Sequence, residues 1–125
     1  MKDILTLFLL TIFCFSCSDI DTTLIKTSAN NSKTKKVVLL NSDGNATVDI
    51  SYQISVYDFE YKLTGHELGN VFAVDRNHGA TGLDTSSINF KWLSNDTVLI
   101  DFDKKLRTFI QENKINGVTI LYQPR

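Results

Sequence analysis

The sequence is poor in cysteine and proline, and neither sign of charge dominates it. Its 125 residues include two cysteines and one proline, and the formal net charge is −1. Both cysteines, Cys14 and Cys17, lie within the first seventeen residues. Disulfide bonds, cysteine-ligated zinc and thiol nucleophiles are therefore excluded from the rest of the chain. The balanced charge provides no strongly basic face, so we expect no nucleic-acid partner.

No apolar run is long enough to cross a membrane as a helix. The longest run begins at Ile4 and is about 12 residues long, whereas a spanning helix needs roughly 20. It follows Lys2 and ends at Ser16 and Cys17. A short apolar segment that ends at a small residue and a cysteine is typical of a bacterial lipoprotein signal peptide.

We therefore expect residues 1–17 to be a lipoprotein signal peptide, with Cys17 carrying acyl chains such as palmitate. Cys14 and Phe15 depart from the Leu-like and small residues usual at those positions, and the alternative is an ordinary cleaved signal peptide. Two or more acyl chains would hold the protein stably at a membrane. The expected location is the cell envelope of a Gram-negative bacterium, as an outer-membrane lipoprotein. Acidic residues in the segment 18–21 would favour exposure at the cell surface.

The next segment differs in composition from everything that follows. Residues 18–35 are rich in Ser, Thr, Asn and Lys and contain no aromatic residue. Such a segment buries too little apolar surface to offset the entropy of ordering it. We expect it to be a flexible tether, followed by a single β-rich domain over residues 36–125.

Hydrophobic alternation with a period of two predicts a mainly β fold. Apolar residues alternate with polar ones from Ala46 to Val56, and shorter alternations occur over residues 88–92, 98–102 and 118–122. Residues 37–40 and 71–74 are short, continuous apolar runs, which predict two further strands. We expect a small antiparallel sheet of hairpins with about five or six strands. Leu106, Phe109 and Ile110 have helical spacing, so the segment 103–112 is interpreted as one short helix.

The loop after residue 74 carries the best candidates for a site. Asp75 and His78 lie three positions apart, with Asn77 and Gly79 beside them. An aspartate and a histidine on one loop can bind a divalent ion or act as a general base. No third ligand occurs at a spacing typical of metal sites, so we expect no metal. The alternative is a loop histidine that hydrogen-bonds its own loop.

Two further features have a structural explanation beside a functional one. Trp92 offers a platform on which a sugar can stack, but it shares its parity with Phe90, which favours packing in the core. Asp101 and Asp103 are two carboxylates of the kind that bind calcium or carry out acid–base chemistry. They flank Phe102, which places them on the solvated face of a strand.

Three blocks of sequence follow one another along the domain: 45–47 with 51–56, 69–75 with 77–80, and 92–100 with Gly117, Val118 and Tyr122. Together they resemble a family of small, uncharacterised, β-rich bacterial domains, here carried on a lipoprotein. The resemblance covers nearly the whole domain and implies a shared fold without an established activity. It also implies that Asp75, His78 and Gly79 are the first positions to test for a shared site.

We expect a lipid-anchored envelope protein without catalytic activity or cofactor, which binds an unknown envelope protein or glycan. No nucleophile elbow and no phosphate-binding loop occurs in the sequence. The alternative is an inhibitor or immunity-type lipoprotein that blocks an envelope enzyme, which is an analogy of form. A hydrolase or metal-dependent enzyme that uses Asp75 and His78 is a further alternative.

Overall fold

The described part of the chain is built from strands. The computed structural model describes residues 21–43 and 49–125. Within these ranges the regular elements are nine strands: β1 Thr22–Ala29, β2 Lys35–Ser42, β3 Ser51–Asp58, β4 Phe72–Asp75, β5 Ile88–Ser94, β6 Thr97–Phe102, β7 Arg107–Gln111, β8 Lys114–Ile115 and β9 Val118–Pro124. The prediction of a mainly β fold is confirmed, with more strands than expected.

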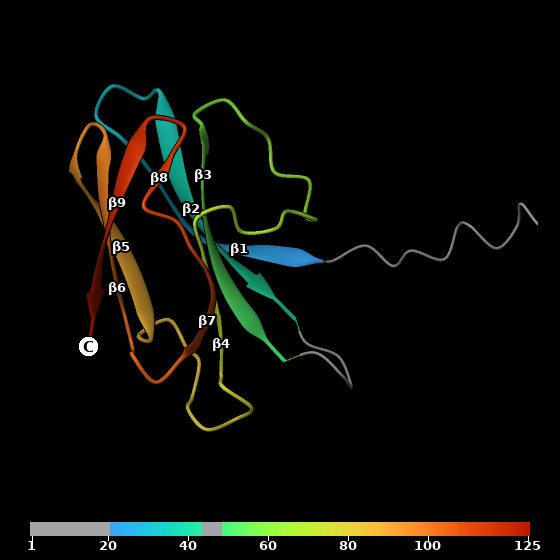
Figure 1. Cartoon of the computed structure of the whole chain (residues 1–125). Helices are drawn as coiled ribbons and strands as arrows, with labels where there is room; N and C mark the ends of the chain where they lie inside the picture. Colours follow the sequence, from blue (N-terminus) through green and yellow to red (C-terminus); the bar gives the residue numbers. More distant parts are fainter. Residues whose placement is uncertain (1–20, 44–48) are drawn as a thin grey trace, which may run out of the picture.

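These strands form two sheets that pack face to face (Figure 1). Five strands pair in the order β1-β2-β3-β4-β7, and every neighbouring pair is antiparallel. The other four pair in the order β5-β6-β9-β8, in which β6 and β9 run parallel. The parallel pair was not foreseen, because it joins segments that the sequence suggested were hairpins. The architecture is a β-sandwich.

Alternate side chains of both sheets meet in one hydrophobic core. From the five-stranded sheet come Val37, Leu39, Tyr52, Ile54, Val56, Phe72 and Val74; from the other come Ile88, Phe90, Val98, Ile100, Phe102, Val118 and Ile120. Phe72 packs against Phe102 across the two sheets, with 4.8 Å between ring centroids. The expectation of hairpins is confirmed for residues 88–102, since the consecutive strands β5 and β6 pair antiparallel.

The tether predicted over residues 18–35 is wrong from Thr22 onwards. Residues 22–29 form β1, which pairs with β2 along its whole length. Most of its side chains are exposed, and Ile25 packs against the core. The strand is therefore stabilised mainly by its backbone hydrogen bonds to β2, which a composition argument cannot detect. The folded domain consequently begins before residue 36.

The short helix predicted over residues 103–112 is also wrong. Asp103 instead starts a tight turn, because its carboxylate accepts a hydrogen bond from the Lys105 amide at 2.9 Å and its carbonyl accepts one from Leu106 at 3.1 Å. The following residues form β7 and pair with β4. Among the described residues, no helix is long and apolar enough to cross a membrane.

The long connection between β3 and β4, residues 59–71, covers the outer face of the five-stranded sheet. Gln53 and Ser55 were expected on a solvated face, yet they are only 7% and 0% exposed. Their side chains accept hydrogen bonds from the backbone amides of Gly69 and Asn70, at 2.6 and 3.1 Å. We call residues 59–71 the β3–β4 connection. It gives β3 two buried faces, which overrides the alternation read from the sequence.

Candidate functional site

The predicted loop residues lie together at the end of β4. Asp75 is the last residue of this strand, and its Oδ1 accepts a hydrogen bond from the Asn77 amide at 2.8 Å. Asn77, His78 and Gly79 have φ angles of 52°, 58° and 81° in succession. Left-handed backbone costs free energy for any residue other than glycine, although asparagine and histidine adopt it more often than most, and it persists where surrounding contacts over-determine it. The loop is therefore held in a strained, tightly defined turn.

An arginine that the sequence did not reveal is the centre of this cluster. Arg107 lies opposite Asp75 in the register of β4 and β7. Its Nε donates to Asp75 Oδ1 at 3.1 Å and its Nη2 to Oδ2 at 2.5 Å, which is a bidentate ion pair. Asp75 is 3% exposed. Burial raises the pKa of Asp75, but the hydrogen bonds from Arg107 and Asn77 outweigh this and hold the pKa below its usual range.

His78 is linked to Asp75 through the same arginine. Arg107 Nη1 lies 2.8 Å from His78 Nε2. A guanidinium group can only donate, so Nε2 of His78 is the acceptor. The Arg107 guanidinium also lies over the Phe109 ring, 4.7 Å from the centroid. Arg107 thus holds an aspartate, a histidine and an aromatic ring in one arrangement.

A second ion pair lies beside the first. Arg76 Nε and Nη2 both donate to Asp49 Oδ1, at 2.8 and 2.6 Å. The hydrogen bond from Arg76 lowers the pKa of Asp49 below its usual range. Asp49 and Arg76 lie just before β3 and just after β4, so neighbouring strands position them. Two carboxylates and two guanidinium groups therefore neutralise one another at this end of the sheet.

These residues border a hollow on the outer face of the five-stranded sheet. Its volume is about 280 Å³, and its lining residues are Asp49, Ser51, Gln53, Ala73, Asp75, Arg107 and Phe109. We call it the outer groove. The small side chain of Ala73 leaves space between β3 and β7, and Phe109, 58% exposed, forms an apolar wall. The groove therefore offers both polar and apolar contacts.

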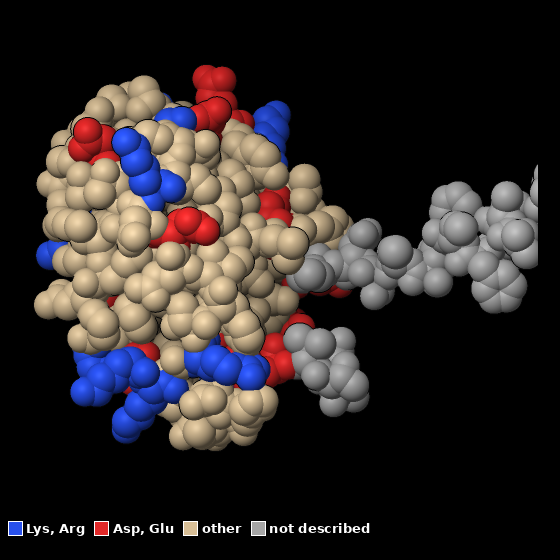
Figure 2. All heavy atoms as spheres, viewed as in Figure 1, with Lys and Arg blue, Asp and Glu red and all other residues tan. Residues whose placement is uncertain are grey.

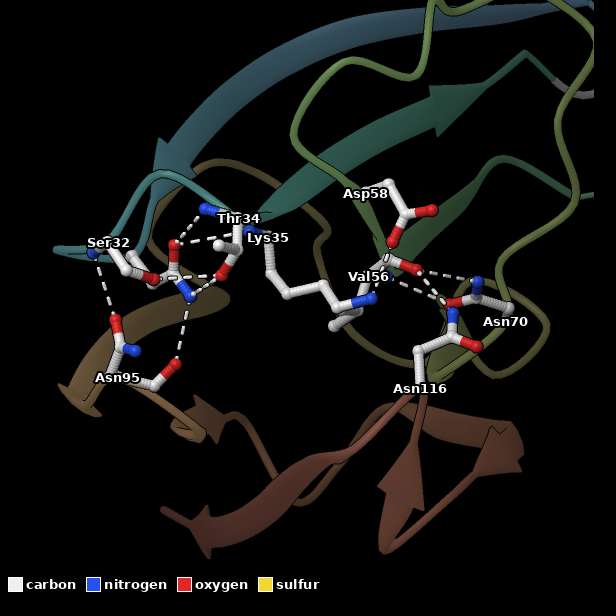
Figure 3. A network of polar contacts seen from close by, with 9 residues as sticks. Ser32, Thr34, Lys35, Val56, Asp58, Asn70, Asn95 and Asn116 are labelled. Atoms are coloured by element: carbon white, nitrogen blue, oxygen red, sulfur yellow. Dashed lines mark hydrogen bonds and ion pairs between the residues drawn. The ribbon is translucent and has the colours of Figure 1, made fainter.

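The β3–β4 connection fixes the polar side of the outer groove. A Cβ atom at Gly69 would lie 2.8 Å from Gln53 Cβ and 3.1 Å from the Phe72 carbonyl, so only glycine permits this approach. Asn70 continues the attachment, as Figure 3 shows: its Oδ1 accepts from the Val56 amide at 2.9 Å and its Nδ2 donates to the Val56 carbonyl at 3.0 Å. The asparagine side chain thus imitates the backbone of a paired strand.

Trp92 does not belong to this cluster. Its indole Nε1 donates to the Ser28 carbonyl on β1 at 3.0 Å, and β1 and β7 are opposite edges of the five-stranded sheet. Nearby, the Ser32 amide donates to Asn95 Oδ1 at 3.0 Å and links the β1–β2 turn to the β5–β6 turn (Figure 3). Asn30 Nδ2 also donates to the Asn95 carbonyl, at 2.9 Å. The tryptophan is therefore partly in the core and partly a bridge between the two sheets.

Asp101 and the other histidine, His66, have partners outside this cluster. Asp101 forms an ion pair with Arg125, and His66 Nδ1 lies 3.4 Å from Asp21. Within residues 21–43 and 49–125, no three His, Cys, Asp or Glu side chains are grouped so as to hold a metal ion. Cys17 lies outside the described residues, so its lipidation stays a prediction.

Comparison of the chain with protein-family models, curated proteins and solved structures found no match. The resemblance to a family of small bacterial domains therefore stays a prediction.

Proposed function

We propose that this chain is a lipid-anchored cell-envelope protein whose β-sandwich is a non-catalytic binding module, with the outer groove as its ligand site. The mutual pairing of all the charges beside the groove is the observation on which this proposal depends. Asp75 is bound by Arg107, and Asp49 is bound by Arg76. A general acid or base needs a pKa near the working pH and a free proton path, whereas both carboxylates have lowered pKa values.

The paired charges also indicate what kind of ligand the groove accepts. Arg107 already donates to Asp75 and His78, so it is poorly placed to bind an additional anion. The oxygen of the Gln53 amide is taken by the Gly69 amide, and its Nε2 donates to Ser51 Oγ at 3.2 Å. The groups left to a ligand are Oδ2 of Asp49, a buried acceptor without a hydrogen-bond partner among the described residues, the hydroxyl of Ser51 and the exposed ring of Phe109. This combination favours an uncharged ligand with hydroxyl or amide groups on one side and an apolar surface on the other, as in a neutral glycan segment.

The position of the outer groove agrees with a role at the membrane surface. Thr22 pairs with Ser42, Ser42 with Ser51, Ser51 with Asp75, and Asp75 with Arg107. One row across the sheet therefore joins the start of β1 to the groove, over four strand spacings or about 19 Å. A chain anchored at Cys17 would hold the groove close to the lipid headgroups.

The lipid anchor is tested on the protein as it is made in a Gram-negative host. We expect the wild type to enter the detergent phase of a detergent partition, and mass spectrometry to find acyl chains on Cys17. The Cys17→Ser variant should remain in the aqueous phase. A free Cys17 thiol in the wild type would contradict the anchor.

The groove is tested by titrating the protein with neutral N-acetylglucosamine oligomers and following backbone amide signals by NMR. The shifts should cluster at Ser51, Gln53 and Phe109. Ala73→Leu, which fills the floor of the groove, should abolish them, while Leu121→Ala on the opposite sheet should leave them unchanged. Shifts that survive in Ala73→Leu would remove the groove as the binding site. The absence of any shift would exclude this glycan class.

A further inference from the structure

The proposed anchor leaves little distance between the membrane and the folded domain. β1 begins at Thr22, so only residues 18–21 separate it from Cys17. The five residue steps from the Cα of Cys17 to the Cα of Thr22 span at most about 18 Å in a fully extended chain. The domain therefore cannot move far from the bilayer, and the surface around the start of β1 is the one that faces the lipid.

The β3–β4 connection lies directly beside this point. The Thr22 amide donates to the Gly65 carbonyl at 2.7 Å, which fixes the tip of the connection to the start of β1. Figure 1 shows the connection and the start of β1 projecting on the same side of the molecule. A membrane surface that faces the start of β1 in an anchored protein therefore also faces the tip of the connection.

Two exposed leucines lie on the two elements that this hydrogen bond joins. Leu68, in the β3–β4 connection, is 62% exposed, the highest value among the large apolar side chains of the described residues. Leu24 is 45% exposed and pairs with Leu40, which places it on the outer face that the connection covers. We call Leu24, Gly65 and Leu68 the anchor-side surface.

We infer that the anchor-side surface rests on the lipid headgroups, with Leu24 and Leu68 inserted into the interface. This inference depends on the proposed lipidation of Cys17. Two leucines alone give weak membrane binding, but an anchor makes their insertion an intramolecular step with a high effective concentration. Each leucine side chain then leaves water at no further cost in translational freedom.

The charges around the anchor-side surface indicate which lipids it meets. Asp21 directly precedes β1, and Asp43 directly follows β2, whose Ser42 pairs with Thr22. Figure 2 shows acidic atoms beside the grey chain and basic side chains gathered at the lower end of the view. Acidic residues repel anionic headgroups, so the contact is apolar and suits zwitterionic lipid.

The experiment places a tryptophan on the surface of the full, lipidated protein. Leu68→Trp and Leu24→Trp are reconstituted into phosphatidylcholine vesicles, with Leu121→Trp as the matched control. Leu121 is 45% exposed on the outward face of β9, in the four-stranded sheet. Trp92 is present in all three variants and contributes the same background. Thermal melting confirms that each variant is folded.

We expect the emission of the two anchor-side reporters to shift to shorter wavelength in vesicles and to be quenched by brominated phosphatidylcholine. The Leu121→Trp reporter should show neither effect. If the anchored protein shows no quenching at positions 24 and 68, the surface assignment fails while the lipid anchor stands. A blue shift without quenching would mean contact between protein copies and would also overturn the inference. A free thiol at Cys17 would overturn both the anchor and the surface.

Discussion

Substituting Gly69 by alanine tests how the β3–β4 connection is held on the sheet. The added Cβ would lie 2.8 Å from Gln53 Cβ and 3.1 Å from the Phe72 carbonyl. Both atoms are fixed by strand backbone and cannot swing aside, so the connection itself must lift. Lifting it would also break the 2.6 Å hydrogen bond from the Gly69 amide to Gln53.

The cost can be bounded from these contacts. Overpacking of a well-packed site costs typically about 1–3 kcal/mol. In a domain of this size each kcal/mol lowers the melting temperature by about 4–8 °C, so the midpoint should fall by about 4–24 °C. The uncovered outer face should also bind a hydrophobic dye, because Val38 and Leu40 are each only 1% exposed and share this face with their β3 partners Ser55 and Gln53.

Gly82 provides the matched control within the same chain. A Cβ atom at Gly82 would meet nothing within 4 Å. Gly82→Ala should therefore change the free energy of unfolding by less than about 0.5 kcal/mol. Both variants are compared with the wild type by circular dichroism melting. If Gly69→Ala melts together with Gly82→Ala and the wild type, the close contact of the connection with β3 is refuted.

Three further predictions concern the ion pair, the tryptophan and a turn. Because the pKa of Asp75 is lowered, its ion pair with Arg107 stabilises the fold above about pH 4, and this stabilisation is lost as the pH falls further. In Asp75→Asn the free energy of unfolding, measured by urea titration, should therefore fall less steeply on the acid side than in the wild type. An unchanged acid limb would show that the pair contributes nothing. Trp92→Phe removes the indole donor to Ser28 and should cost about 0.5–1.5 kcal/mol in denaturant unfolding. Gly117 has a φ angle of 78° and open space around it, so Gly117→Ala should lower the free energy of unfolding by roughly 1–2 kcal/mol through backbone strain alone. A cost equal to that of Gly82→Ala would contradict this turn geometry.

The turn between β8 and β9 carries a local sequence signature, the pair Asn116–Gly117. Asn116 and Gly117 have φ angles of 49° and 78°, as a two-residue hairpin with positive φ at both central positions requires. The strands at Val37–Leu40 and at residues 71–74 were also predictable, because continuous apolar runs of this length suit strands covered on both faces. These features depend on neighbouring residues alone.

β1 and the buried polar residues of β3 could not be predicted in this way. The strand β1 is ordered by a partner that supplies its hydrogen bonds, and Gln53 and Ser55 are buried by a connection whose path is fixed by Gly69 and Asn70. Composition and alternation describe only what a segment brings to the fold. They do not describe what lies against it.

The sequence predicted only the loop residues of the candidate site, and one feature of β7 explains why Arg107 and Phe109 were missed. Arg107 and Phe109 were hidden because the spacing of Leu106, Phe109 and Ile110 imitates a helix. In the structure this spacing comes from a β-bulge: Ile110 pairs with Ala73 and Thr108 with Val74, so Phe109 is the extra residue. Without the extra residue, the pairing register of β7 with β4 would be shifted by one residue on one side of Phe109. The bulge allows Gln111 to pair with Phe72 and Arg107 to face Asp75 at the same time, and it turns Phe109 towards the outer groove. Phe109, which contributed to the wrong helix prediction, therefore also completes the lining of the outer groove.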